Sequence, residues 1–157
     1  MSNGYRTILH HAGRALRMIL LHLIDRPSDP IMLHCKLGRD RTGVIIAMLL
    51  SLAGVTDEII AKEYQLTEVG LGPMREDVVA DVLGREKDGQ KLKKKVDCLV
   101  GAREKNMLDM LASLREDFGS AEQFVKEMCG LNQEDIDAVR GVLVVGVAPC
   151  HYAGGVV

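Results

Sequence analysis

The sequence predicts an α/β fold that is mostly helical, with one short strand leading into a glycine-containing loop. Apolar residues recur at helical spacing through most of the chain, which is the pattern of amphipathic helices. An apolar run at 31–33 is too short for a helix, and Pro27 and Pro30 precede it, so a buried strand is predicted there. The chain has 157 residues, 47% of them hydrophobic, which suffices for one domain with a packed core.

The first predicted helix covers residues 6–25, where six apolar side chains recur at helical spacing: Ile8, Ala12, Ala15, Leu16, Ile19 and Leu23. The predicted strand follows at 31–34, and residues 36–41 form a predicted loop. From 42 to 53 the chain is apolar on every side, so the helix predicted there belongs inside the domain.

The next predicted helix begins after Thr56, whose side chain can cap it, and runs to about Glu68. The two acidic residues that follow Thr56 suit the first turn, because negative charge is favoured at a helix N-terminus. Residues 70–73 form a predicted turn, and a further helix is predicted through about Gly84.

Residues 85–95 are strongly polar, with six basic and two acidic side chains. One interpretation is a solvated loop or the frayed end of a helix, which is what most runs of charge are. The other is a basic patch attracted to anionic membrane lipid. The sequence alone leaves both interpretations open.

The C-terminal part of the chain predicts further helices. Four apolar residues form a stripe along the first of them: Met107, Leu111, Leu114 and Phe118. Ser120 and Gln123 form a predicted capping box, and Gly130 is a predicted C-cap. Asn132 is predicted to cap a last helix that carries apolar residues through Leu143.

Residues 142–157 are rich in β-branched residues and glycine, unlike the helical segments before them. They can form a strand or remain a loose tail, and we favour the tail. The predicted domain therefore covers residues 1–143, and residues 144–157 are an apolar, glycine-containing tail.

Composition excludes several classes of function. A formal net charge of -2, with 3% aromatic residues and no Trp, predicts neither the basic surface nor the stacking side chains of a nucleic-acid-binding protein. The four cysteines form no CxxC pair, so neither a zinc site nor a redox dithiol is predicted, and we expect no cofactor and no metal. The cysteines concerned are Cys35, Cys98, Cys129 and Cys150.

All four cysteines are predicted to be free thiols in a reducing compartment, so a cytoplasmic location is expected. The first residues lack the apolar core of a signal peptide. The longest apolar run, residues 44–50, is far too short to cross a bilayer, so no stable membrane insertion is expected.

The segment from His34 to Gly43 has the pattern of an anion-binding loop. A predicted strand ends at Cys35, a short loop follows and a buried helix begins, so successive backbone N–H groups can turn toward one point beside the helix N-terminus. Gly38 permits a backbone conformation that a Cβ would resist. A phosphate group is the expected occupant, held by six residues: Lys36, Leu37, Gly38, Arg39, Asp40 and Arg41.

Cys35 is the predicted nucleophile. A helix N-terminus and adjacent cations lower a thiol pKa from about 8.5 to roughly 3.5–7.5, so Cys35 is expected to be largely thiolate. Arg41 can hold two phosphate oxygens and offset transition-state charge, and Thr42 can hydrogen-bond the sulfur when it leaves. A lone cysteine after a strand is usually structural, but here Gly, Arg, Thr and Gly also stand at the required offsets.

Cys35 and Arg41 enclose five residues, which resembles the signature of the protein tyrosine phosphatase superfamily. More narrowly, His34-Cys35 with Gly38 and Asp40-Arg41-Thr42-Gly43 is similar to the tyrosine/serine protein phosphatase family whose loop reads HCxxGKDRTG. The resemblance covers about residues 5–143, with further matching stretches at 57–68, 102–107, 118–120 and 130–131.

The resemblance implies a two-step reaction in which Cys35 takes the phosphoryl group and water then removes it. It also implies a general acid for the leaving group, a role that this family assigns to the loop aspartate, here Asp40. The alternative is that Asp40 only shapes the loop by hydrogen-bonding backbone amides, because the positive field of the loop opposes acid function. His34 is expected to hydrogen-bond the loop backbone and steady Cys35.

The sequence departs from the family pattern at two points. Arg39 stands where the family usually has Lys, which keeps the charge and changes its shape. Family members also carry a long segment before the helix at 6–25, and that segment supplies most of their central sheet. The expected fold is therefore phosphatase-like but truncated, with residues 1–143 as the C-terminal portion of a cysteine-dependent phosphatase domain.

Three functions follow from these observations. The leading one is a phosphomonoester hydrolase that acts on phosphotyrosine in proteins, with phosphoserine and phosphothreonine as further candidates. The cations Lys36 and Arg39 would suit a polyphosphorylated headgroup, so a phosphoinositide phosphatase is the first alternative. A truncated protein that binds phosphate without turnover is the second. The sequence indicates neither the natural substrate nor the oligomeric state.

Overall fold

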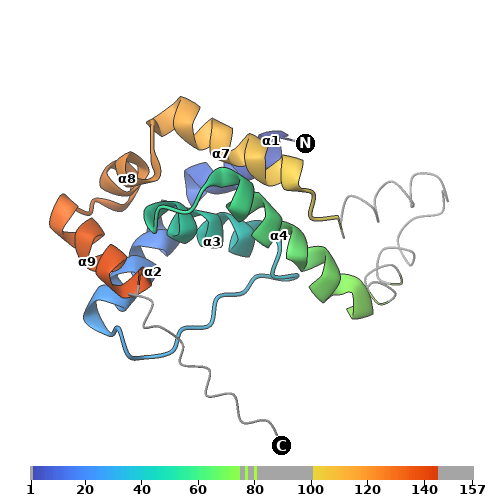
Figure 1. Ribbon diagram of the computed structural model, residues 1–157, viewed down its shortest axis with the longest axis horizontal. Helices are drawn as coiled ribbons and strands as arrows, with labels where there is room; N and C mark the ends of the chain where they lie inside the picture. Colours follow the sequence, from blue (N-terminus) through green and yellow to red (C-terminus); the bar gives the residue numbers. More distant parts are fainter. Residues whose placement is uncertain (1, 75–76, 78–79, 81–100, 145–157) are drawn as a thin grey trace, which may run out of the picture.

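The computed structural model describes residues 2–74, 77, 80 and 101–144, and within these ranges the chain is almost entirely helical (Figure 1). The helices in chain order are α1 (Ser2–His11), α2 (Gly13–Asp25), α3 (Asp40–Leu52), α4 (Asp57–Leu71), α7 (Glu104–Phe118), α8 (Ala121–Phe124) and α9 (Gln133–Leu143). A short 3₁₀ turn, η1 (Gly72–Met74), follows α4, and a π-helical turn, η2 (Val125–Cys129), follows α8.

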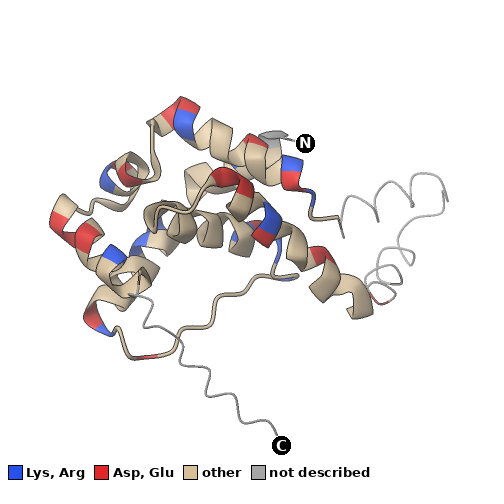
Figure 2. Ribbon diagram, in the orientation of Figure 1, with Lys and Arg blue, Asp and Glu red and all other residues tan. Residues whose placement is uncertain are grey.

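Helix α3 is the centre of the structure, as its apolar sequence predicts. It contacts α1, α4, α8 and α9, and Figure 1 shows it surrounded by the other helices. Four of its side chains are at most 1% exposed: Val44, Ala47, Met48 and Leu52. Figure 2 shows charged residues of both signs along the outer helices, whereas α3 carries charge only at Asp40 and Arg41 in its first turn.

The strand predicted at 31–34 is not formed, and no strand occurs in the part of the chain that the structure describes. Residues 30–35 form an irregular segment between α2 and α3 (Figure 1). The side chains of Ile31 and Met32 are 40% and 86% exposed, so the segment is not buried either. A strand needs a neighbour to pair its backbone groups, and no described segment supplies one here.

The single helix predicted over 6–25 is two helices, broken at Ala12. Each part packs against a different partner: α1 lies on α7 and α3, while α2 lies on α9 and η2. The break lies where the backbones approach most closely, because a Cβ on Gly13 would come within 2.7 Å of the Met128 carbonyl oxygen. Tertiary packing therefore sets this boundary, and the apolar periodicity continues through it.

The helix ends agree with the local sequence signals in most cases. Asn132 and Asp135 form a complete capping box at α9, with both bonds at 3.0 Å. Gly130 ends η2 with φ +62°, in the left-handed region that favours glycine. The Ser120 hydroxyl accepts from the Gln123 N–H, which is one half of the predicted box. The predicted cap at Thr56 is wrong in its chemistry, since that side chain makes no capping hydrogen bond.

Two arginines tie the helices together. Arg115 on α7 holds Asp57 at the start of α4 through two hydrogen bonds of 2.5 and 2.6 Å. Arg140 on α9 donates from Nε to the Leu52 carbonyl at 2.8 Å, which satisfies one of the free carbonyls at the end of α3. These contacts hold the end of α3 and the start of α4, where the two helices join.

Two predicted features lie outside the described residues: the basic segment at 85–95 and most of the tail at 144–157. Helix α4 continues to Leu71, and η1 follows it. Beyond η1, the helix predicted through Gly84 is described only at residues 77 and 80. In the described ranges, every helix is too short or too polar to cross a membrane.

Candidate active site

Helix α3 begins at Asp40, two residues earlier than predicted, so Asp40 and Arg41 lie in its first turn rather than in the loop. The loop before it is irregular from His34 to Arg39. The segment thus leads into the helix N-terminus, where backbone N–H groups are free to meet an anion. This is the loop-to-helix arrangement that the sequence predicts, formed without the strand.

The Cys35 thiol lies within a ring of hydrogen-bond donors. Burial raises its pKa, but the Thr42 hydroxyl and the backbone N–H groups of Thr42, Leu37 and Arg39 all lower it. The resulting pKa is about 7, well below the ordinary value of a cysteine. At neutral pH a large fraction of Cys35 is therefore thiolate, the form that acts as a nucleophile.

Gly38 makes this convergence of N–H groups possible. Its φ is +64°, and no neighbouring atom would contact a Cβ placed there. The glycine is therefore required by the backbone conformation and not by lack of space.

Arg39 and Asp40 form an ion pair beneath the loop. The Arg39 side chain donates from Nε to Asp40 Oδ1 at 3.0 Å and from Nη2 to Oδ2 at 3.2 Å. Arg39 is only 6% exposed and is the buried charged residue of the described ranges. Its Nη1 also reaches the Gly101 carbonyl at 3.4 Å. The Arg39 guanidinium is thus directed into the protein, while the Arg39 backbone N–H is one of the groups that lower the pKa of Cys35.

Two tyrosines that sequence reasoning missed complete this cluster. The Tyr5 hydroxyl of α1 donates to Asp40 Oδ1 at 2.5 Å and lies 2.5 Å from the Tyr64 hydroxyl of α4. The two rings meet edge to face, with centroids 6.1 Å apart. Tyr5 and Tyr64 are 59 positions apart in the chain, so no local pattern could have paired them.

The Tyr64 ring also explains the glycine after Thr42. A Cβ on Gly43 would lie 2.9 Å from two carbons of the Tyr64 ring, closer than side-chain carbons approach. Glycine is therefore needed at position 43 so that Tyr64 can pack against the first turn of α3.

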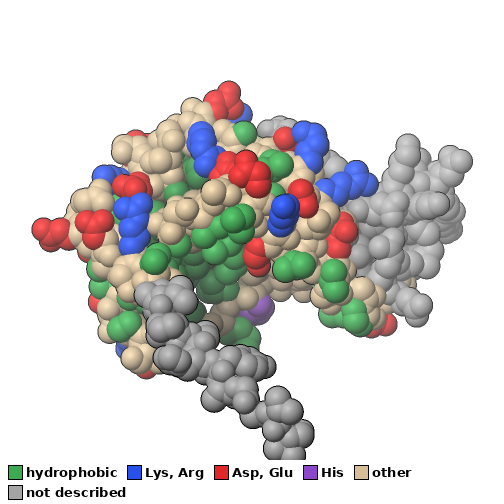
Figure 3. All heavy atoms as spheres, in the orientation of Figure 1, with side chains coloured by type: hydrophobic (Ala, Val, Ile, Leu, Met, Phe, Trp, Pro, Cys, Tyr) green, Lys and Arg blue, Asp and Glu red, His purple; other side chains and the backbone are tan. Residues whose placement is uncertain are grey.

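Arg41 is exposed and borders an apolar cavity of about 370 Å³. The other lining residues come from α1, α2 and α3: Thr7, Ile8, His11, Ala12, Ala15 and Ile45. Figure 3 shows hydrophobic side chains gathered in a hollow on one face of the molecule, along α3. The role of Arg41 as a phosphate ligand stays a prediction.

The two remaining predicted residues, His34 and Lys36, are both exposed. The hydrogen bond from the His34 side chain to the loop backbone stays a prediction. The side-chain contacts that the structure shows next to the loop are those of Asp40 with Tyr5 and Arg39.

Cys129 provides a contrast within the same molecule. It is 3% exposed, and its thiol donates to the Gly13 carbonyl at 3.3 Å. Burial raises its pKa to about 11 against the lowering effect of Arg17. Cys35 and Cys129 are free thiols as predicted, and the other two cysteines lie outside the described residues.

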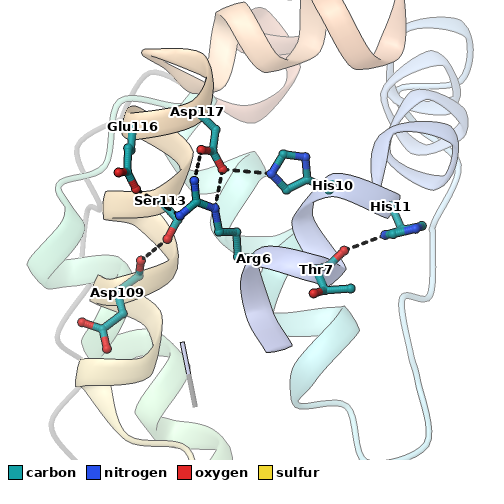
Figure 4. A network of polar contacts seen from close by, with 8 residues as sticks. All are labelled: Arg6, Thr7, His10, His11, Asp109, Ser113, Glu116 and Asp117. Atoms are coloured by element: carbon teal, nitrogen blue, oxygen red, sulfur yellow. Dashed lines mark hydrogen bonds and ion pairs between the residues drawn. The ribbon is translucent and has the colours of Figure 1, made fainter. Parts of the chain in front are cut away.

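Helix α1, which carries Tyr5, is held on α7 by a charged cluster (Figure 4). Arg6 donates to both carboxylate oxygens of Asp117, from Nε at 2.8 Å and from Nη2, and reaches Glu116 at 3.2 Å. His10 Nε2 lies 2.9 Å from Asp117 Oδ2, the oxygen that also accepts from Arg6 Nε, and the His10 ring packs against Phe118. The position of Tyr5 therefore depends on contacts well away from the loop.

Comparison with known proteins gives a consistent result. A family model described as the tyrosine phosphatase family matches residues 1–145. The chain is 23% identical over 154 residues to the triple specificity protein phosphatase PtpB of Mycobacterium tuberculosis, covering 92% of the chain and 54% of that protein. It is 25% identical over 143 residues to a tyrosine-protein phosphatase of Nostoc commune, covering 89% of the chain and 48% of that protein. The chain thus spans about half the length of these relatives.

Proposed function

The chain belongs to the tyrosine phosphatase family, and from this we propose that it hydrolyses phosphomonoesters, with phosphotyrosine in proteins as the substrate and a phosphocysteine at Cys35 as the intermediate. Both relatives are named as protein phosphatases. Phosphoserine and phosphothreonine are further candidate substrates, and the mycobacterial relative is itself named a triple specificity protein phosphatase.

One observation carries the proposal: the Thr42 hydroxyl and three backbone N–H groups lower the pKa of Cys35, which lies just before the N-terminus of α3. The same donors that stabilise a thiolate can stabilise the oxygens of a phosphoryl group. A structural cysteine has no need of them, and the buried Cys129 has a raised pKa in their absence.

In the first step, the Cys35 thiolate attacks phosphorus, and the bond from phosphorus to the substrate oxygen breaks. The leaving phenolate takes a proton from solvent water, and Arg41 offsets the charge on the phosphoryl oxygens. In the second step, water attacks phosphorus, the sulfur–phosphorus bond breaks, and inorganic phosphate leaves. The Thr42 hydroxyl, which lowers the pKa of Cys35, stabilises the thiolate as it is released.

The contacts of Asp40 favour a positioning role over the role of general acid. Its carboxylate accepts hydrogen bonds from Tyr5 and from Arg39, so both of its oxygens are engaged within the protein. A phenol leaving group, with a pKa of about 10, depends less on acid assistance than a serine or threonine alkoxide does.

The burial of Arg39 favours phosphotyrosine over a phosphoinositide. The headgroup alternative requires both Lys36 and Arg39 to face the substrate, but the Arg39 guanidinium is directed into the protein toward Asp40. Lys36 and Arg41 remain exposed at the loop. We therefore expect faster hydrolysis of a phosphotyrosine peptide than of a soluble phosphoinositide.

Hydrolysis of para-nitrophenyl phosphate tests the proposed function. The unmodified chain should release nitrophenol, and Cys35→Ser should reduce the rate on the order of 10³-fold or more, because an alcohol replaces the thiolate. The matched control is Cys129→Ser, which changes the other described thiol, keeps a donor for Gly13 and should retain activity.

Turnover that survives Cys35→Ser would contradict the mechanism. Binding of vanadate with no hydrolysis by the unmodified chain would instead support the second alternative, a phosphate-binding protein without turnover. A higher rate on the soluble phosphoinositide than on the phosphotyrosine peptide would favour the first alternative, a phosphoinositide phosphatase.

A further inference from the structure

Two tyrosine hydroxyls from helices far apart in the sequence meet beneath the loop. The Tyr5 hydroxyl is 2.5 Å from Asp40 Oδ1 and 2.5 Å from the Tyr64 hydroxyl. Tyr5 is 9% exposed and Tyr64 is 2% exposed, so water does not compete freely for these bonds. A buried polar chain of this kind is costly unless each member is satisfied.

The order of donors in the chain follows from counting protons. Burial raises the pKa of both tyrosines, and the Asp40 bond raises that of Tyr5 further, so both phenols stay protonated at neutral pH. Tyr5 has one proton and donates it to the Asp40 carboxylate. The bond between the phenols must then run from Tyr64 to the Tyr5 oxygen. The hydrogen bonds therefore run in one direction, from Tyr64 to Tyr5 and from Tyr5 to Asp40. We call this chain of three residues the relay.

Asp40 connects this relay to the sulfur of Cys35. Its carboxylate holds the buried Arg39 guanidinium, and the backbone N–H of Arg39 is one of the donors to Cys35. Tyr64 contacts the site a second time, because its ring packs on the backbone of Gly43. Tyr5 on α1 and Tyr64 on α4 therefore both support the loop.

We propose that Tyr5 and Tyr64 are positioning residues for the loop: their hydroxyls fix the Asp40 carboxylate, which holds Arg39 so that its backbone N–H stays directed at the Cys35 sulfur. This inference rests on the proposed function for its catalytic meaning. Neither tyrosine touches the reacting atoms, and the effect reaches the thiolate through Asp40 and Arg39.

Loss of the Tyr5 hydroxyl should raise the pKa of Cys35 for two reasons that act in the same direction. Arg39 becomes less well fixed, which weakens a donor to the sulfur, and the Asp40 charge loses a partner that disperses it. The other ionisable groups around the loop are Lys36 on the loop itself, Arg41 in the first turn of α3 and Glu68 on α4. They stay the same in every variant, as does the neighbouring His34.

Alkylation of Cys35 by iodoacetamide, followed from pH 5 to 9 by mass spectrometry, tests the inference without relying on turnover. The rate for the unmodified chain should rise with a midpoint of about 7. Tyr5→Phe should move the midpoint upward by roughly half a pKa unit, which slows alkylation at pH 6 about threefold. Tyr64→Phe should shift it in the same direction and by less, because Tyr5 keeps its own bond to Asp40.

The double variant gives the decisive comparison. If Tyr64 acts through Tyr5, the double variant should have the same midpoint as Tyr5→Phe alone, whereas independent effects would add. His11→Ala is the matched control on the same helix: it removes a bond to the Thr7 carbonyl within α1 and touches neither hydroxyl, so it should leave the midpoint within about 0.2 units of the unmodified chain.

An unchanged midpoint in folded Tyr5→Phe would overturn the inference, and so would additive shifts. If Tyr5→Phe does not fold, Tyr64→Phe decides: an upward shift supports the relay and no shift refutes it. Hydrolysis of para-nitrophenyl phosphate is measured alongside. A chain that shows the midpoint shifts and hydrolyses nothing keeps the relay and loses the proposed function, and an active chain without the shifts does the reverse.

Discussion

Cys35 and Cys129 show how surroundings decide what one residue type can do. Burial acts on both thiols in the same direction and raises each pKa. Only Cys35 has enough donors to reverse the effect, and its pKa falls to about 7 while that of Cys129 rises to about 11. At pH 7 a thiol-selective reagent should therefore modify Cys35 and leave Cys129 intact.

Gly43 is the residue whose replacement should be most damaging for its size. We expect Gly43→Ala to destabilise the protein by about 1–3 kcal/mol, because the added methyl group would overlap the buried Tyr64 ring. Unfolding in urea, followed by circular dichroism, measures the change in the free energy of unfolding.

Gly141→Ala is the matched control for that experiment. A Cβ at Gly141 meets no atom within 4 Å, so this change should be neutral or stabilise α9 by up to about 1 kcal/mol. Equal losses in the two variants would show that the contact between Gly43 and Tyr64 does not matter.

At the level of the helices, the capping box at α9 is the clearest local determinant. Asn132→Ala should cost about 1 kcal/mol, because it removes the acceptor for the Asp135 N–H and leaves that group without a partner in the protein. The free energy of unfolding measures the loss. Thr56→Ala, at the start of α4, removes no capping hydrogen bond and should cost less; a larger loss there would contradict this account.

Local signals of this kind explain which elements could be predicted. The caps at Gly130 and Asn132 depend on residues within a few positions of each other, and the sequence identifies both. The strand at 31–34 and the unbroken helix over 6–25 were wrong because both depend on distant partners. A strand requires a neighbouring strand, and the break at Ala12 coincides with the close approach of Gly13 to Met128.

The same distinction applies to the candidate site. Cys35, Arg41 and Thr42 can be proposed from the sequence because their chemistry depends on fixed offsets along a short segment. Tyr5 and Tyr64 could not, because they meet Asp40 only when α1 and α4 pack on α3. The sequence also could not predict that the Arg39 side chain points into the protein. The loop pattern is the same whether this side chain faces a substrate or bonds to Asp40, the next residue.

For the molecule as a whole, the charged cluster between α1 and α7 is a main attachment. Asp117→Asn should lower the melting temperature at pH 7, because it weakens the bonds to Arg6 and His10. The His10 bond and the Arg6 charge lower the pKa of Asp117, so its stabilising effect is complete above the unfolded value of about 4. That effect is lost as pH falls through the lower folded value, and the difference between the two proteins should shrink there.

Glu116→Gln is the control for this prediction. Glu116 also meets Arg6, at 3.2 Å, but its side chain is 69% exposed, against 13% for Asp117. It should therefore change the melting temperature by less. An equal change in the two variants, or a difference for Asp117→Asn that persists at pH 2, would contradict the role given to Asp117.

The attachment of α1 to α7 also has a consequence for biosynthesis. Arg6 and Asp117 are 111 positions apart, so the partner that fixes α1, and with it Tyr5, emerges from the ribosome long after Cys35. At ordinary rates of translation, the roughly 80 residues between Cys35 and the end of α7 take about 4 to 17 seconds to make. During that interval the nascent chain carries its thiol without the support from Tyr5, and the loop can be completed only when α7 is present.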